Sequence, residues 1–281
     1  NIYRINPDKK DIKEKVLTHE QMNAFNGVVS SFNKHEVFLL HGITGSGKTE
    51  VYIKLVESVI KNGKTVIVMV PEITLTTQIV KRFYETFGSS VAIFHSGLSD
   101  GEKYDEYSKI LKGEASIVVG TRSSIFVPLK NIGLIIIDEE HTSSYKQENN
   151  PRYHAVDMAI FRAKYHNCPV VLGSATPRLE SMARAKKGVY KYLTLKNRVG
   201  DAKLPKIELI DLSASYKNGG SILSTDLQVK IMSRLENHEQ VMLLLNRRGY
   251  STIITCASCG YTYKCPNCDI TLTYHKSSNS L

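Results

Sequence analysis

Residues 42–49 form a glycine-rich segment, Gly-Ile-Thr-Gly-Ser-Gly-Lys-Thr, with the spacing of a phosphate-binding loop. Its glycines let the backbone turn sharply and aim N–H groups at phosphate oxygens. Lys48 would place a cation on the β- and γ-phosphates, and the Thr49 hydroxyl can ligate Mg²⁺. An ordinary glycine turn is the alternative. We therefore predict that ATP is bound by Gly42, Ile43, Thr44, Gly45, Ser46, Gly47, Lys48 and Thr49.

A second motif, Asp-Glu-Glu-His at residues 138–141, follows the apolar run 134–137. Such an apolar run predicts a central parallel strand, and open α/β sheets bind ligands at the carboxyl ends of their strands. There, Asp138 can hold Mg²⁺ and Glu139 can deprotonate the attacking water. The alternative is a helix N-cap by Asp138, and both roles can hold at once. Lys48, Asp138, Glu139 and His141 form the predicted catalytic group.

Apolar runs and helical stretches alternate along most of the chain, which predicts a parallel sheet covered by helices. The helix after the phosphate loop would add its positive N-terminus to the phosphate site. The expected strands are 37–40, 66–70, 91–94, 117–119, 134–137 and 170–172. The expected helices are 49–61, 74–87, 101–112 and 154–166.

The pattern breaks around residues 196–206, and a second α/β unit is expected to begin there. Its elements would be strands 207–210, 241–245 and 252–255 and a helix at 225–237. The domain boundaries that we predict are a linker at 1–16, a first lobe at 17–198, the start of a second lobe at 199–255 and a cysteine module at 256–281.

Four of the five cysteines form two C-x₂-C steps: Cys256, Cys259, Cys265 and Cys268. Paired steps of this kind in a nucleotide enzyme that looks cytosolic indicate Zn²⁺ rather than disulfides, with free thiols as the alternative. The fifth, Cys168, is predicted to be a small buried residue.

Basic residues outnumber acidic ones by 37 − 27 = 10, and hydrophobic residues make up 42% of the chain. This composition predicts a globular protein with a cationic surface, which suits nucleic acid or serves solubility. No stretch is long and apolar enough for a membrane span, and no signal peptide is visible. We therefore expect no membrane partner. Because residue 1 is Asn and the last residues follow the cysteines closely, we expect both ends to lie inside a longer protein.

Further segments resemble, in order, the motifs of superfamily 2 helicases: 70–78, 119–124, 173–177 and 245–250. The Asp-Glu-Glu-His box, the motif Asn-Arg-Arg-Gly-Tyr and the cysteines right after it are similar to one family, the bacterial replication-restart helicases known as PriA. The resemblance covers residues 17–275. It implies an α/β fold: a RecA-like P-loop NTPase lobe with helices on both faces of a parallel sheet, plus the start of a second RecA-like lobe that carries a small zinc-binding module.

By position, the resemblance implies further site residues. Gln21 would read adenine, although Thr18-x-x-Gln21 is also a capping box. The residues implied to hold single-stranded DNA are Thr76, Thr77, Thr121 and Arg122, with helix capping and surface solvation as the alternative. Ser174, Thr176, Arg247 and Arg248 would couple the ATP site to DNA. In the aromatic-rich loop 143–154, Tyr145 and Tyr153 would stack on bases while Lys146 and Arg152 meet phosphates, unless the tyrosines are partly buried anchors.

Three departures from the family stand out. Val156 occupies a position where the family usually has an arginine. The family binds two Zn²⁺ through eight cysteines, whereas four stand in the module here, so each site would be half-built. The later helicase motifs, with their arginine finger, and the preceding DNA-binding domains are not in this sequence. We therefore expect this chain alone to bind nucleotide weakly and not to unwind DNA.

The resemblance implies an ATP-dependent DNA helicase of the primosome, located in the bacterial cytoplasm. It would recognise stalled or repaired forks, unwind DNA 3′ to 5′ and promote reloading of the replicative helicase. Its partners would be forked and single-stranded DNA, primosome proteins, single-stranded-DNA-binding protein and a helicase loader, and its cofactors ATP, Mg²⁺ and Zn²⁺. The alternatives are another superfamily 2 DNA translocase, or a zinc-ribbon nucleic-acid adaptor in which ATP binding is only a switch.

Overall fold

The structure is a computed structural model that describes residues 16–71, 78–200, 205–210, 223–244, 256, 259, 261–268 and 270–272. The chain forms two compact units, Asn1–Lys203 and Leu204–Leu281. Within the described residues, no helix has both the length and the apolar character that a membrane span requires.

The first unit is a seven-stranded sheet in the order β3-β4-β2-β5-β8-β1-β9, and all of its strands are parallel. The strands are β1 (Val37–Gly42), β2 (Thr65–Met69), β3 (Val91–Phe94), β4 (Ile117–Gly120), β5 (Ile132–Ile137), β8 (Val170–Ser174) and β9 (Lys191–Leu195). All six strands predicted for this unit are confirmed, whereas β9 was not predicted. Its sequence, Lys-Tyr-Leu-Thr-Leu, buries only its last residue and therefore carries a weak apolar signal.

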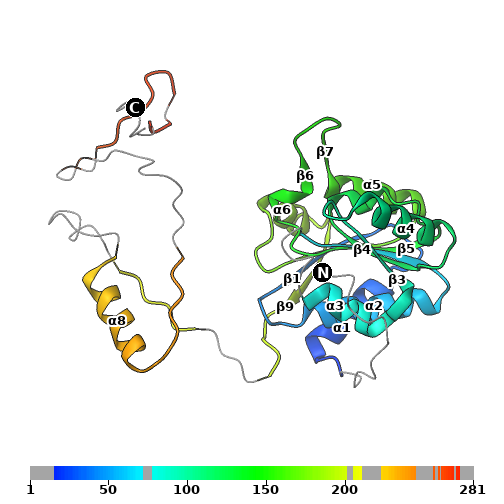
Figure 1. Cartoon of the computed structure of the whole chain (residues 1–281), viewed down its shortest axis with the longest axis horizontal. Helices are drawn as coiled ribbons and strands as arrows, with labels where there is room; N and C mark the ends of the chain where they lie inside the picture. Colours follow the sequence, from blue (N-terminus) through cyan, green and yellow to red (C-terminus); the bar gives the residue numbers. More distant parts are fainter. Residues whose placement is uncertain are drawn as a thin grey trace. The chain divides into compact units, whose positions relative to one another are not determined.

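Helices cover both faces of this sheet (Figure 1). One face carries α1 (His19–Val29), α2 (Lys48–Lys61) and α3 (Gln78–Phe87), and the other carries α4 (Asp100–Leu111), α5 (Ala155–His166) and α6 (Leu179–Lys186). Alternate strand residues face the two layers: Val66 and Val68 of β2 join one core, and Ile67 and Met69 join the other. A strand buried on both faces must be apolar throughout, which explains the continuous hydrophobic runs in the sequence.

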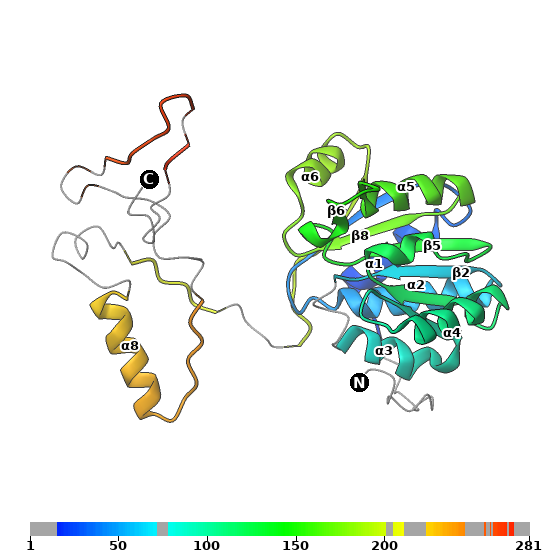
Figure 2. The same ribbon diagram turned by 45° about the horizontal axis from the view of Figure 1, so that its top comes forward.

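The strand order brings the two chemical motifs together. β8 lies between β5 and β1 in the sheet, so the acidic box after β5 and the phosphate loop after β1 are one strand apart. Figure 2 shows β8 beside β5. In register, Leu40 of β1 pairs with Gly173 of β8, and His41 pairs with Ser174. The carboxyl ends of β5, β8 and β1 therefore form one edge, where ligands of open parallel sheets bind.

The second unit contains α8 (Thr225–Glu236), which confirms the helix predicted at 225–237. The strands predicted at 207–210 and 241–245 are not formed in residues 205–210 and 241–244. A strand satisfies its backbone groups only through a neighbouring strand. No described residue of these two segments pairs in this way, so the apolar sequence alone was insufficient. The predicted strand 252–255 lies outside the described residues.

Candidate active site

The phosphate loop runs from the end of β1 to the start of α2 and borders a cavity of about 700 Å³. Gly45 and Gly47 have φ values of +81° and +80°, a region that residues with side chains rarely adopt. A Cβ at Gly47 would lie 2.3 Å from the Gln21 amide nitrogen, so a side chain at this position would displace the Gln21 amide. Lys48 donates to the Gly42 carbonyl at 2.8 Å, which folds its ammonium back over the loop. The loop therefore has the open backbone cradle that phosphates require.

Gln21 belongs both to a capping box and to this cavity. Its side-chain oxygen accepts from the Thr18 N–H at 2.9 Å, and its amide nitrogen donates to the Ser46 carbonyl at 2.9 Å. The residue is buried and lines the cavity with Thr18. A carboxamide offers two donors and two acceptor lone pairs, so these two bonds leave capacity for a purine edge. Capping and base reading are therefore compatible at this position.

The segment at and after the end of β9 is hydrogen-bonded both to the phosphate loop and to α1, and so acts as a clamp on the loop. Val199 donates its N–H to the Gly45 carbonyl at 3.0 Å, and Ile43 donates to the Leu195 carbonyl at 3.2 Å. Glu20 accepts from the backbone N–H groups of Lys196 and Asn197 at 2.9 and 3.2 Å. This clamp was not predicted. It depends on β9 adding to the sheet edge, and nothing local in the sequence indicates that position.

Asp138 lies at the end of β5 and is almost fully buried, with 4% of its surface exposed. The Tyr52 hydroxyl donates to its carboxylate at 2.9 Å, and the Tyr145 hydroxyl donates to its backbone carbonyl at 2.7 Å. Burial raises the pKa of Asp138 to about 6, and the neighbouring charge of Glu139 adds to this shift. A desolvated carboxylate beside a cationic loop is a suitable ligand for a hard divalent cation.

Glu139 adopts the left-handed backbone conformation, with φ at +47°. This turn directs its carboxylate back toward the phosphate loop, 3.9 Å from Lys48 Nζ and 3.5 Å from His141 Nδ1. A strained backbone at a carboxylate that borders a ligand cavity is typical of functional positions. Lys48, Asp138 and Glu139 therefore line one cavity.

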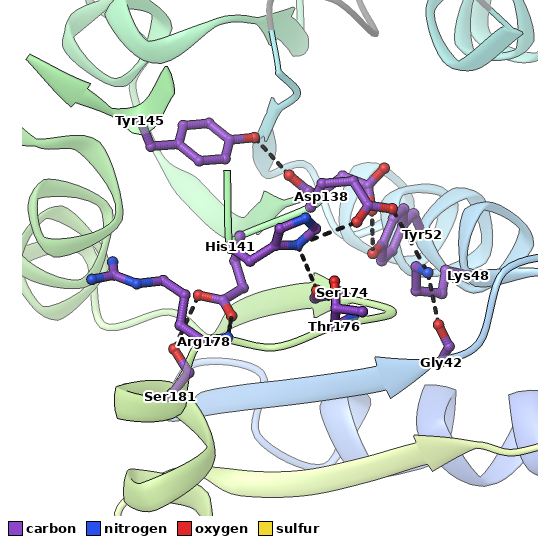
Figure 3. A network of polar contacts seen from close by, with 12 residues as sticks. Gly42, Lys48, Tyr52, Asp138, His141, Tyr145, Ser174, Thr176, Arg178 and Ser181 are labelled. Atoms are coloured by element: carbon purple, nitrogen blue, oxygen red, sulfur yellow. Dashed lines mark hydrogen bonds and ion pairs between the residues drawn. The ribbon is translucent and has the colours of Figure 1, made fainter. Parts of the chain in front are cut away.

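His141 links the end of β5 to the end of β8 (Figure 3). Its Nδ1 lies 2.8 Å from the Ser174 hydroxyl, and the same hydroxyl accepts from the Thr176 N–H at 3.0 Å. Glu139, His141, Ser174 and Thr176 thus form a continuous chain of polar contacts. The predicted coupling residues Ser174 and Thr176 are in contact with the predicted catalytic group. Arg247 and Arg248 lie outside the described residues.

Glu140, which was not predicted as a site residue, is the most deeply buried carboxylate of the box. It accepts from the Arg178 N–H at 2.8 Å and from the Ser181 hydroxyl at 3.0 Å, so it caps the start of α6. Its own N–H donates to the Gly173 carbonyl at 3.0 Å. An acidic residue at a helix N-terminus is stabilised by the helix dipole. Glu140 therefore fixes the acidic box to β8 and α6, a role that its place in the motif alone did not reveal.

The segment 143–154 forms a hairpin, with β6 (Lys146–Gln147) antiparallel to β7 (Tyr153–His154). Lys146 and Arg152 are exposed, as expected for residues that would meet phosphates. Tyr153 is half-buried and packs edge-on against the exposed Phe126 ring, with centroids 5.0 Å apart. Tyr153 of the hairpin and the neighbouring Phe126 thus form an aromatic pair.

Three predicted DNA contacts lie differently from expectation. Tyr145 is buried and bound to the Asp138 carbonyl, so its ring is an anchor and is not available to stack on a base in this conformation. Thr121 is likewise buried, at 2% exposure. The Arg122 guanidinium donates to the carbonyls of Ser144 and Lys146 at 3.2 and 2.7 Å, so it holds the hairpin. The orientations of these side chains depend on contacts between segments that are distant in the sequence, so local sequence patterns could not predict them.

Two further predictions concern this part of the site. Val156, where the family usually has arginine, is buried in the core face of α5. Arg178 reaches the hairpin instead, with its guanidinium 2.9 Å from His154 Nε2. Burial and the nearby Arg178 charge lower the pKa of His154. The predicted contacts Thr76 and Thr77 lie outside the described residues.

Two backbone hydrogen bonds of the same sequence span occur in the cysteine segment. Cys256 donates its N–H to the Tyr261 carbonyl at 2.8 Å, and Cys265 donates to the Ile270 carbonyl at 2.9 Å. Hydrogen bonds from the Asn267 backbone and the Cys268 side chain lower the pKa of Cys265. In the described part of the chain, however, no group of three or more metal-ligating side chains comes together. Within the described residues, each C-x₂-C step thus presents two thiols, which is half of a tetrahedral site.

Known protein families match two separate parts of the chain. The family described as "Type III restriction enzyme, res subunit" matches residues 14–179, more than half of the chain. The family described as "PriA DNA helicase Cys-rich region (CRR) domain" matches residues 265–281. The match of a cysteine-rich zinc-ribbon region supports zinc as a cofactor of this segment in general terms.

The "Replication restart protein PriA" of Bacillus subtilis (strain 168) is 54% identical over 268 residues, which cover 94% of this chain and 33% of that protein. The protein of the same name from Haemophilus influenzae is 42% identical and covers 94% of this chain and 36% of its own length. This chain thus spans about a third of the length of these curated relatives.

Solved structures share the fold. A DEAD-box helicase, "Mss116 bound to ssRNA and UDP-BeF", has a TM-score of 0.50 and 17% identity, covering 79% of this chain and 48% of that one. A "RecG bound to three-way DNA junction" has a TM-score of 0.49 and 26% identity, covering 68% and 25%. At this level of identity the first likeness establishes the fold alone, which is the RecA-like helicase architecture expected from the sequence.

Proposed function

Since the chain belongs to the family described as "Type III restriction enzyme, res subunit" and to the replication restart proteins PriA, we propose that it carries the ATP-hydrolysing lobe of a DNA helicase. The observation that supports this most is the shared cavity of Lys48, Asp138 and Glu139. Each of the three supplies a different part of phosphoryl transfer to water, and a binding-only switch would not need Glu139.

The proposed roles follow from the positions of the side chains. Lys48 would leave the Gly42 carbonyl and bind the β- and γ-phosphates. Thr49 and Asp138 would ligate Mg²⁺, which neutralises phosphate charge and orients the nucleotide. Glu139, directed toward the cavity by its left-handed backbone, would take the proton of the attacking water. Gln21 would hydrogen-bond the adenine edge with the donor and acceptor that its capping bonds leave.

The DNA side of the proposal rests on the hairpin 143–154. Lys146 and Arg152 are exposed for phosphates, and Tyr153 with Phe126 offers an aromatic surface for a base. The hairpin reaches the acidic box by two routes: the Tyr145 hydroxyl on the Asp138 carbonyl, and His154 on Arg178, whose N–H binds Glu140. A nucleic acid that moves the hairpin would therefore perturb the catalytic edge.

At the level of the whole protein, we propose ATP-driven 3′-to-5′ unwinding at stalled or repaired forks, followed by reloading of the replicative helicase. Primosome proteins, single-stranded-DNA-binding protein and a helicase loader would be the partners, and the bacterial cytoplasm the location. The full-length protein would bind two Zn²⁺, with Cys256 and Cys259 at one ion and Cys265 and Cys268 at the other. Another superfamily 2 translocase without a restart role is the second candidate; the match of residues 265–281 to the PriA cysteine-rich region favours the first.

An ATPase assay tests the proposal. The full-length protein should hydrolyse ATP in the presence of forked or single-stranded DNA, and Glu139→Gln should lower turnover by about 10²–10⁴ while it retains nucleotide binding. This chain alone should turn over slowly, because an arginine supplied by the second lobe of such enzymes is worth about 10³–10⁵ in rate. Equal DNA-stimulated rates for this chain and the full-length protein would contradict the proposal that an arginine of the second lobe is needed for fast turnover. Unchanged turnover in Glu139→Gln would refute the assignment of the base.

A further inference from the structure

The Asp138 carboxylate is held by a tyrosine from the helix of the phosphate loop. Tyr52 of α2 is fully buried, and its hydroxyl donates to Asp138 Oδ1 at 2.9 Å (Figure 3). A second buried tyrosine, Tyr145, holds the backbone carbonyl of the same residue at 2.7 Å. Asp138 is therefore held at both ends: its carboxylate accepts from the Tyr52 hydroxyl and from the Glu139 backbone N–H, and its carbonyl accepts from Tyr145.

The neighbouring strand leaves room for this hydroxyl. An ideal Cβ on Gly173 of β8 would lie 1.7 Å from the Tyr52 oxygen and 3.4 Å from Asp138 Oδ1. Only glycine at this position lets the phenol pass beneath the carboxylate. The Tyr52 hydroxyl thus lies where α2, β5 and β8 meet, at the edge that carries the proposed chemistry. Both Tyr52 and Gly173 are needed for the contact.

The contact has a chemical consequence. A carboxylate can rotate about its terminal bond, and a divalent cation is bound well only when the oxygens face it. A buried phenol that donates one hydrogen bond limits this rotation, and because its ring is packed in the core the donor cannot follow the carboxylate. We infer that Tyr52 is a positioning residue that orients Asp138 toward the divalent cation bound with the nucleotide. This inference rests on the proposed function.

A purely structural role for Tyr52 predicts something different. If its hydroxyl served only to satisfy a buried polar group, then Tyr52→Phe would lower stability and would weaken nucleotide binding equally with and without metal. A positioning role weakens only the part of nucleotide affinity that depends on the cation. The difference between ADP affinity in Mg²⁺ and in EDTA therefore separates the two.

The test is calorimetric titration of ADP into the full 281-residue chain, in Mg²⁺ and in EDTA, for three variants. Mg²⁺ raises ADP affinity by a certain factor in wild type, and this factor should be about tenfold smaller in Tyr52→Phe and in Gly173→Ala. A tenfold change is the scale of a hydrogen bond to a charged group. The affinities of both variants in EDTA should stay within about twofold of wild type. Tyr190→Phe is the matched control, because it also removes a buried hydroxyl. That hydroxyl accepts from the Arg184 guanidinium at 2.7 Å and does not belong to the site.

The outcomes are separable. An unchanged Mg²⁺-dependent gain in folded Tyr52→Phe would overturn the inference, and so would an equal loss in EDTA. Thermal unfolding of each variant shows whether it is folded, and Gly173→Ala displaces the phenol if Tyr52→Phe does not fold. Absence of Mg²⁺-dependent ADP binding in the wild-type chain would instead refute the proposed function itself.

Discussion

Replacing Asp138 by Asn is expected to stabilise the protein while it removes the cation ligand. Burial, with the adjacent Glu139 charge, raises the pKa of Asp138 from 3.8 to about 6. Because the folded-state pKa is raised, the stability contributed by the neutral form is fully present below pH 3.8 and is lost as the pH rises through about 6. One pKa unit corresponds to about 1.4 kcal/mol, so the ionised carboxylate costs the folded state about 3 kcal/mol at pH 8.

Asn at position 138 keeps an oxygen that can accept from the Tyr52 hydroxyl and carries no charge. We expect its free energy of unfolding to exceed that of wild type by about 3 kcal/mol at pH 8, with the difference shrinking toward zero as the pH falls from about 6 to 3.8. Urea unfolding in EDTA, followed by circular dichroism at several pH values, measures this difference. Asp105→Asn, at an exposed position of α4, is the control for removal of a carboxylate outside the site.

A difference that stays constant between pH 4 and 8 would refute this reasoning, as would a variant that is less stable than wild type at pH 8. Either result would mean that Asp138 is not desolvated as its burial indicates. Nucleotide titrations of the same variant should show no gain in affinity from Mg²⁺, which separates the functional loss from the gain in stability.

Five further outcomes are expected. Lys48→Ala should lose most nucleotide affinity, measured by ADP titration, whereas Glu139→Gln should bind normally and lose about 10²–10⁴ in turnover; near-normal turnover would exclude the base. Mg²⁺-dependent ADP affinity in wild type should fall as the pH drops below about 6, where protons compete for Asp138. Tyr153→Ala should cost roughly 1–3 kcal/mol of single-stranded DNA affinity, measured by fluorescence anisotropy, and an unchanged affinity would place the bases elsewhere. Arg122→Ala should loosen the hairpin and speed amide exchange there; unchanged exchange would contradict its bonds to Ser144 and Lys146.

The sequence alone predicted six of the seven strands of the sheet in the first unit and the positions of the phosphate loop and the acidic box. Strands buried on both faces must be continuously apolar, and helices between them must be amphipathic, so both patterns are visible in one dimension. The phosphate loop and the acidic box are local as well, because Gly47 must adopt a left-handed backbone and Asp138 must end a strand. These features depend on residues close together in the chain.

Contacts between distant segments were decided only by the tertiary structure. Whether Tyr145 faces a base or the core, and whether Arg122 meets phosphate or the hairpin carbonyls, depends on how η3 (Arg122–Phe126), the hairpin and β5 pack together. The Tyr52 hydroxyl reaches Asp138 only because β8 places a glycine between them. The type of a side chain determines which groups it can bind. Which of those groups it meets depends on the strand order, because the strand order decides which distant segments become neighbours, and no single segment of the sequence determines that order.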